Sequence, residues 1–167
     1  GLEEARLIHF GVVENEPGAG GRCLLVDLGG GSCEVTLSEH KRIRETISLP
    51  LGAVRLTQDF LRSDMPGKQD IARLRQFIAR ELRKARRRVD ATGIRLTIAT
   101  SGTAAALADA SRALGKGKGR RGGRDLAPAK TVRRLAAKVT KMKNAERAMV
   151  PGIGPRRSEI IVAGAQV

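Results

Sequence analysis

Three consecutive glycines interrupt the most apolar strand-like stretch of the chain, and this interruption constrains the fold more than any other feature. The stretch LLVDLGGGSCEVTLS runs from Leu24 to Ser38, with Asp27 before the glycines and Glu34 after them. Residues 23–28 form a nearly continuous apolar run, typical of a central strand, whereas residues 33–38 alternate between apolar and polar. We therefore expect two successive strands joined by a loop of bare backbone.

Glycines in this position are typical of a backbone that approaches a phosphate closely, because side chains would block the amides. The alternative is a tight hairpin turn that only needs positive φ. Three glycines exceed the needs of a two-residue turn, and Asp27 and Glu34 add groups suited to a metal ion or a water molecule. A P-loop and a dinucleotide fingerprint both need a helix after their glycines, whereas Ser32 leads into a strand. The pattern predicts a phosphate-binding β-hairpin.

The rest of the chain predicts an α/β fold. Residues 41–50 predict a third strand, which forms an antiparallel hairpin with the second through the short turn Glu39–His40. A fourth strand over 94–100 runs into a helix at Ser101–Gly102. The expected helices cover residues 2–13, 52–63, 69–89, 103–114 and 127–142, and a last one begins in the segment 155–167.

Two of these helices have a readable apolar face. In the helix over 69–89 the face consists of Ile71, Leu74, Ile78, Leu82, Ala85 and Val89, with Arg and Lys on the other side. In the first helix it consists of Leu2, Ala5, Ile8 and Val12. Pro128 is expected in the first turn of its helix, where a missing N–H costs nothing.

Charged residues are unevenly distributed, with an acidic N-terminal part and a basic part later in the chain. The 167 residues suffice for one domain with a core, and their net charge is +15. Residues 1–40 carry seven acidic and two basic side chains, whereas residues 111–147 carry thirteen basic and two acidic ones. The acidic part could hold a metal ion or water, and the basic part could attract a polyanion. We expect the glycine-rich basic stretch 115–127 to be a flexible loop.

Other function classes are disfavoured. No apolar run reaches the roughly 20 residues of a membrane span, and the acidic N-terminus excludes a secretory signal. The absence of an initiator Met suggests that the chain begins inside a larger protein. Cys23 and Cys33 stand at the starts of successive strands, at opposite ends of a hairpin, which argues against a disulfide and for reduced, buried thiols in a cytoplasmic protein. His9 and His40 lack the spacing of zinc ligands.

The glycine loop resembles the second phosphate loop of the actin-like ATPase superfamily, and VDLGGGSCE is similar to the Ppx/GppA phosphatase family of exopolyphosphatases and guanosine pentaphosphate phosphohydrolases. Further similar segments follow in family order: GLEEARLIHFGV, SLPLGAVRLTQDF, ATSGTAAALA and PGIGPRRSEIIVAGAQV. The family's N-terminal loop Asp-x-Gly-Ser-Asn and its last strand have no counterpart. The resemblance implies that residues 1–167 are a second lobe, truncated at both ends, with a ribonuclease H-like mixed sheet and flanking helices.

The resemblance also implies a phosphoanhydride hydrolase that releases terminal phosphate from inorganic polyphosphate or guanosine pentaphosphate. Glu4 matches the glutamate that orients or deprotonates water, and Asp27 and Glu34 match acids that assist it through Mg²⁺. The matched phosphate-binding residues are Gly29, Gly30, Gly31, Ser32, Gly102, Thr103 and Arg157. The active site would be completed by the missing N-terminal lobe, so we expect the isolated chain to be inactive. Family members often form homodimers.

Each residue also has a simpler interpretation. Glu4 could be an ordinary acid in a first helical turn, Glu34 a solvated strand residue, and Thr103 an N-cap. Arg157 could be one more surface charge.

Two other functions stay open. The chain could be an ATP-binding lobe of the actin, Hsp70 or sugar-kinase type, or a non-catalytic module that binds a polyanion or RNA. Nucleic acid is disfavoured by the near absence of aromatic side chains, on which bases stack. The sequence does not separate polyphosphate from guanosine pentaphosphate as the substrate.

Overall fold

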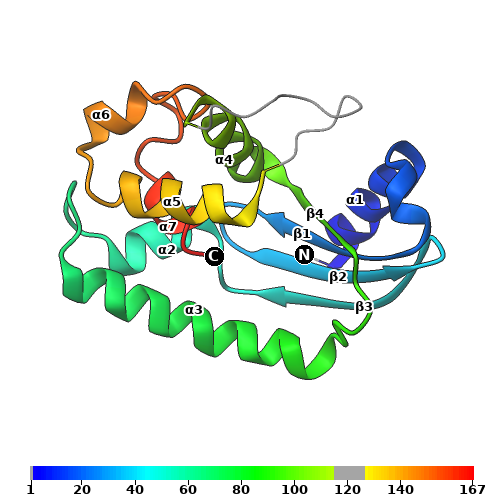
Figure 1. The fold of residues 1–167 in the computed structure, drawn as a ribbon. Helices are drawn as coiled ribbons and strands as arrows, with labels where there is room; N and C mark the ends of the chain where they lie inside the picture. Colours follow the sequence, from blue (N-terminus) through cyan, green and yellow to red (C-terminus); the bar gives the residue numbers. More distant parts are fainter. Residues whose placement is uncertain (1, 115–126) are drawn as a thin grey trace.

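The chain forms a mixed four-stranded sheet with helices on both faces and a helical cluster beyond one end (Figure 1). In this computed structural model, residues 2–114 and 127–167 are described, so most of the basic stretch 115–127 lies outside the described residues. The strands are β1 (Arg22–Leu28), β2 (Cys33–Glu39), β3 (Arg42–Leu49) and β4 (Leu96–Thr100). The sheet order is β3-β2-β1-β4, and only the pair β1–β4 is parallel.

The expected helices form, with shifted ends. They are α1 (Leu2–Asn15), α2 (Ala53–Phe60), α3 (Lys68–Arg88), α4 (Ser101–Leu114), α5 (Ala129–Val139) and α7 (Ile161–Gly164). Two short helices, η1 (Pro17–Gly20) and α6 (Asn144–Ala148), were not expected from the sequence. Pro128 is the N-cap of α5 rather than a residue of its first turn. None of the helices in the described ranges is both long and apolar enough to cross a bilayer.

The first strand lies inside the sheet, as its apolar run predicts, and the second is buried on both faces. On β2 the side chains of Cys33, Val35 and Leu37 pack against α3, in a core that also contains Ile47 and Leu49 of β3. The other face of β2 is polar but equally buried. The interpretation of Glu34 as a solvated strand residue is therefore wrong, since only 3% of it is exposed.

Helix α1 covers the polar face of β2, and the face that it buries differs from the expected apolar face of Leu2, Ala5, Ile8 and Val12. Its buried residues are Ala5, His9 and Val13, one turn apart, whereas Leu2 is 60% exposed. The reason is the strand beneath: His9 Nε2 lies 2.9 Å from the Ser38 hydroxyl, so a polar side chain fits there better than an aliphatic one. Burial lowers the pKa of His9, because it disfavours the charged imidazolium.

The β2–β3 connection is a two-residue turn of His40 and Lys41, one position later than expected. Both residues have positive φ, 51° and 60°, which matches the twist of a hairpin. Cys23 and Cys33 are buried and unpaired, as predicted.

Beyond the carboxyl ends of β1 and β4, helices α4, α5 and α7 enclose a second core, built from Leu107, Leu135 and Ile161 among others. In Figure 1 this cluster lies to the left of the strands, while α3 runs beneath both. The glycine loop between β1 and β2 lies where the sheet meets this cluster, since its carbonyls bond to the start of α2. The fold therefore brings distant segments to that loop.

Candidate functional site

A row of four polar side chains crosses the whole sheet at its end nearest the glycine loop. In the strand register, Ser48 pairs with Glu34, Glu34 with Asp27, and Asp27 with Thr100. Paired residues on neighbouring strands share a face of the sheet. The Thr100 hydroxyl donates to Asp27 Oδ1 at 2.7 Å, and the Ser48 hydroxyl donates to Glu34 Oε1 at 2.7 Å. The two candidate metal ligands are thus adjacent and each is held at one oxygen.

Both carboxylates of this row are buried, with 9% of Asp27 and 3% of Glu34 exposed. Among the ion pairs of the described residues, neither has a Lys or Arg partner within 4.0 Å. Like charges directly opposite each other on neighbouring strands repel. Burial, with the charges of Glu34 and Asp27, raises the pKa of the Cys33 thiol to about 12. The row is a concentrated negative charge that a cation would stabilise.

The glycine loop turns its carbonyls toward α2. Gly29 O accepts from the Ala53 amide at 2.9 Å, and Gly30 O accepts from the amides of Val54 and Arg55 at 3.0 and 3.1 Å. The Arg55 guanidinium donates to Gly31 O at 2.8 Å. The loop therefore provides the acceptors that the first turn of α2 needs.

The amides of the same loop are left mostly unused. Gly29 N donates to Ser32 O at 3.0 Å, whereas the amides of Gly30, Gly31 and Ser32 donate to no backbone acceptor within the described ranges. Gly30 and Gly31 are exposed. These three N–H groups are available to an anion, whereas Gly29 already uses its amide inside the turn.

Positive φ is not the reason for these glycines. Among the described glycines, φ is positive at Gly93, Gly152 and Gly154 and not in the loop. A β-carbon at Gly31 would meet nothing within 4 Å. Gly31 therefore faces open space, which agrees with a backbone that a ligand approaches.

The Ser-Gly-Thr turn after β4 lies against the entry to the glycine loop. Ser101 has φ of 86°, rare for a residue with a side chain, and its hydroxyl donates to Leu28 O at 2.5 Å. Arg157 Nε donates to Gly102 O at 2.6 Å, so the guanidinium lies on the glycine. Arg157 is thus a packed residue of this turn rather than a free surface charge.

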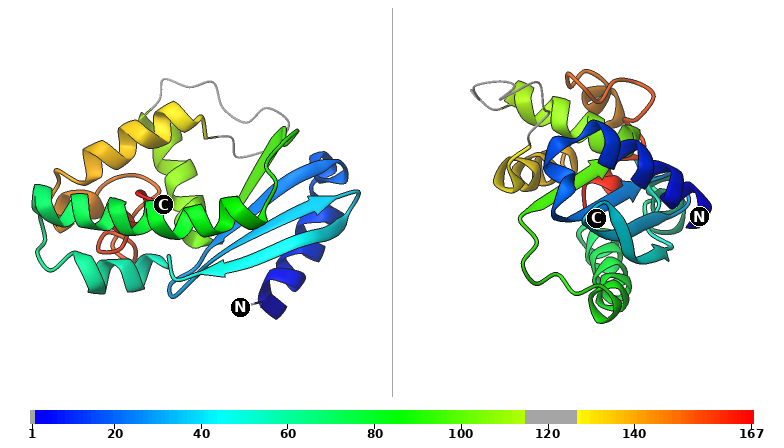
Figure 2. Two further views of the ribbon diagram at one scale, coloured as in Figure 1. Left: turned by 90° about the horizontal axis from the view of Figure 1, so that it is seen from below. Right: turned by 90° about the vertical axis from the view of Figure 1, so that its right-hand side faces the viewer.

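Of the two remaining candidate residues, Thr103 is buried, whereas Glu4 is exposed. The Thr103 side chain is 5% exposed, and its methyl group lies close to Gly164 of α7, where a β-carbon would come within 2.6 Å of it. Glu4 is exposed in the first turn of α1. That helix covers the same face of the sheet as the polar row, with its N-terminal end toward the glycine-loop end (Figure 2).

Sequence reasoning missed several residues of this site. They are Ser48, Thr100, Ser101 and Gly52, whose backbone lies directly against the Gly30 carbonyl. Of these, only Thr100 and Ser101 could have been identified from the sequence, because a Thr-Ser-Gly sequence at a strand end is rich in hydrogen-bond donors. The pairing of Thr100 with Asp27 joins residues 73 positions apart, so no local pattern could reveal it.

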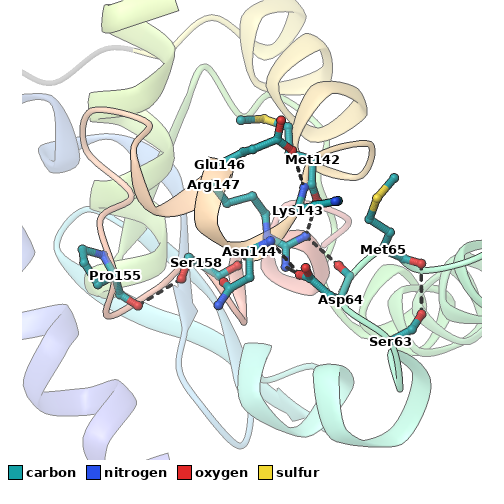
Figure 3. Close-up of polar contacts among 10 residues, drawn as sticks. All are labelled: Ser63, Asp64, Met65, Met142, Lys143, Asn144, Glu146, Arg147, Pro155 and Ser158. Carbon is teal, nitrogen blue, oxygen red and sulfur yellow. Dashed lines mark hydrogen bonds and ion pairs between the residues drawn. The ribbon is translucent and has the colours of Figure 1, made fainter.

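A buried arginine, also missed, supports the segment that carries Arg157. Arg147 is 3% exposed and donates to the carbonyls of Ser158, Met142 and Asp64 and to the Asp64 carboxylate, at 2.7 to 3.0 Å (Figure 3). It thus ties three separate segments together. Because its guanidinium is hydrogen-bonded to protein groups, Arg147 has a structural role in supporting the site.

Comparison with known proteins agrees with this geometry. The model of the Ppx/GppA phosphatase family matches residues 1–167. The chain belongs to this family. Exopolyphosphatase 1 of Mycobacterium leprae is 36% identical over 168 residues, covering 100% of this chain and 49% of that protein. Exopolyphosphatase 1 of Mycobacterium tuberculosis is 37% identical over 168 residues, covering 100% and 48%.

The Ppx/GppA fold is equally clear from a solved structure. The crystal structure of the Aquifex aeolicus Ppx/GppA family member superimposes with a TM-score of 0.81 at 25% identity, covering 98% of this chain and 52% of that one. The chain therefore spans about half the length of the Ppx/GppA proteins that it matches and corresponds to one lobe of their fold.

Proposed function

We propose that this chain is the phosphate-binding lobe of a phosphohydrolase that releases terminal phosphate from inorganic polyphosphate or guanosine pentaphosphate. The observation that carries the proposal is the buried Asp27–Glu34 pair directly beside a loop with three unused backbone amides. Acids next to anion-binding amides suit a phosphoryl group and its counter-ion. The names of the two mycobacterial relatives favour polyphosphate as the substrate.

The acidic row suits Mg²⁺. Asp27 Oδ2 and Glu34 Oε2 accept no hydrogen bond among the described residues, so each carboxylate keeps one hard oxygen donor. No cluster of three His, Cys, Asp or Glu that could hold a metal exists in the described part of the chain. Mg²⁺ commonly takes one or two carboxylates and fills its other positions with water and phosphate oxygens. When bound, it would neutralise charge that develops on the transferred phosphoryl group.

In this proposal the residues share the work of hydrolysis. The amides of Gly30, Gly31 and Ser32 hold the terminal phosphoryl group, and Arg157 holds the rest of the phosphate chain. Glu4 accepts a proton from the attacking water. The new P–O bond forms as the bridging P–O bond breaks, and a chain shorter by one phosphate leaves.

An N-terminal lobe would complete the site, as the half-length match to the relatives supports. Glu4 is exposed on α1, so a second lobe could close over it and exclude water from the reacting groups. The phosphate chain would then lie between two lobes, and this chain alone would not turn over substrate.

The test is phosphate release by the complete protein, with this chain joined to an N-terminal lobe. Glu4→Gln should reduce kcat by about 10² to 10⁴-fold, the usual contribution of a general base. Glu3→Gln is the matched control, because Glu3 lies in the same turn and pairs with Arg6 at the surface, so kcat should change less than about twofold.

Three outcomes separate the parts of the proposal. Failure of the complete protein to release phosphate from either substrate would contradict the function itself. Tight binding of an adenosine nucleotide without such release would favour an ATP-binding lobe. Full activity of the Glu4→Gln protein would leave the function standing and remove Glu4 from its role.

A further inference from the structure

The two carboxylates at the centre of the polar row are held from opposite edges of the sheet. Thr100, on the edge strand β4, donates to Asp27, and Ser48, on the edge strand β3, donates to Glu34, each at 2.7 Å. Neither hydroxyl residue belongs to the glycine loop or to the residues for which the resemblance implies a role. Both nevertheless touch the groups that are proposed to bind the metal ion.

Each hydroxyl occupies only one oxygen of its carboxylate. The second oxygens, Asp27 Oδ2 and Glu34 Oε2, accept no hydrogen bond from the described residues. A fully buried oxygen without a hydrogen bond would count among the buried polar atoms that lack a partner, and neither oxygen does. Both are therefore accessible to solvent or to a ligand. A hydrogen bond to one oxygen fixes the rotation of the carboxylate and thereby the direction of the other oxygen.

The first residue of α4 also holds the backbone next to Asp27. The Ser101 hydroxyl donates to Leu28 O, so Thr100 at the end of β4 and Ser101 at the start of α4 hold two consecutive β1 residues. Ser101 adopts its rare positive φ in making this contact. Such strain persists only where the surrounding structure enforces it and is typical of functional sites.

We propose that Thr100 and Ser48 are positioning residues, whose hydroxyls orient Asp27 and Glu34 so that their second oxygens bind one divalent cation. This inference rests on the proposed function, because it concerns the same acidic pair. It adds the outer contacts that set the geometry of the pair. Outer-shell hydrogen bonds of this kind commonly change metal affinity by 10 to 100-fold.

The experiment measures Mn²⁺ binding to this chain by electron paramagnetic resonance, since Mn²⁺ shares the preference of Mg²⁺ for carboxylate oxygens. Thr100→Val removes the hydroxyl and keeps the shape, and Ser48→Ala does the same at an exposed position. Each should weaken Mn²⁺ binding by about tenfold or more. Thr100→Ser keeps the donor and should bind within about twofold to threefold of the unmodified chain.

The matched control is Thr46→Val. Thr46 lies two residues before Ser48 on the same face of β3, and its hydroxyl lies 3.1 Å from the Thr36 hydroxyl instead of a carboxylate. This variant should leave Mn²⁺ affinity unchanged within about twofold. Thermal unfolding of every variant shows whether it is folded, and the exposed Ser48→Ala carries the test if Thr100→Val does not fold.

Unchanged Mn²⁺ affinity in folded Thr100→Val and Ser48→Ala would overturn the proposal, as would failure of the unmodified chain to bind Mn²⁺. An equal loss in Thr46→Val would overturn it too, because the effect would then belong to any hydroxyl on this face. Phosphate release by the complete protein is measured separately. Loss of Mn²⁺ affinity in a protein without phosphatase activity would support the positioning role and contradict only the proposed function.

Discussion

Gly52 lies so close to the glycine loop that a β-carbon on it would come within 2.2 Å of the Gly30 carbonyl oxygen. The N-terminus of α2 and the loop are therefore pressed together, and the amides of Ala53 and Val54 bond directly to the loop. This contact gives a physical reason for the glycine in the segment SLPLGAVRL.

Gly52→Ala should destabilise the chain, because the atoms that the new methyl group meets are backbone and cannot turn aside. We expect a loss of about 2 to 3 kcal/mol in the free energy of unfolding, typical of overpacking. Urea unfolding followed by circular dichroism measures it. The control is Gly31→Ala, whose β-carbon would meet nothing within 4 Å and should cost less than about 1 kcal/mol. Equal effects of the two substitutions would show that contact with the loop is not the cause.

Arg147→Met should lower stability strongly. The change removes four hydrogen bonds and leaves the carbonyls of Met142 and Ser158 without their partner in a buried region. Breaking such an arrangement costs about 3 kcal/mol or more, visible as a lower Tm. Arg147→Lys should restore little of the lost stability, because an ammonium group cannot reproduce the several fixed hydrogen-bond directions of the planar guanidinium. The exposed Arg83→Met serves as control, and a Tm of Arg147→Met close to that control would contradict a framework role.

The Cys33 thiol should resist alkylation in the folded chain. Burial and the neighbouring carboxylates raise its pKa to about 12, so the reactive thiolate is scarce at pH 8. Labelling of Cys33 with iodoacetamide, followed by mass spectrometry, should be slow until denaturant is added. Rapid labelling of Cys33 in the absence of denaturant would show that the strand opens more readily than its burial indicates.

The same pKa shift gives stability a pH dependence. The pKa of Cys33 lies higher in the folded than in the unfolded chain, so above about pH 9 the folded chain binds more protons. Stability should therefore fall as the pH rises from about 9 toward 12. Cys33→Ala should reduce that slope, measured as the urea midpoint at pH 8 and pH 10. Part of the slope should remain, since burial also raises the pKa of Cys23. An unchanged slope in Cys33→Ala would assign the effect to other groups.

Arg157→Ala should weaken binding of tripolyphosphate by about tenfold, since a charge-assisted hydrogen bond to phosphate is among the stronger polar contacts. Isothermal titration calorimetry at fixed salt concentration measures the change. Arg156→Ala is the control, because this neighbour has the same charge but is exposed and makes no bond to the Gly102 carbonyl. Equal losses in the two variants would mean that tripolyphosphate responds only to net charge.

Much of the architecture follows from local patterns. The apolar run before Gly29 marks a strand inside the sheet, and the turn after Glu39 closes an antiparallel hairpin. The stripe from Ile71 to Val89 predicts the buried face of α3 almost completely, with Glu81 as an unexpected buried member that pairs with Lys84 and Arg80. These features are readable because each depends on side chains a few positions apart.

The sequence by itself therefore determined the order of the strands and of the longer helices, the glycine hairpin and the acids that flank it. Only the tertiary structure decided which side chains hold those acids. Thr100 reaches Asp27 through the parallel β1–β4 pairing, and Gly52 meets Gly30 because α2 docks on the loop. Both contacts depend on strand register and on packing between distant segments, which are set when the whole core closes. For the same reason α1 buries His9 instead of Leu2: the face it presents is chosen by the polar strand beneath it.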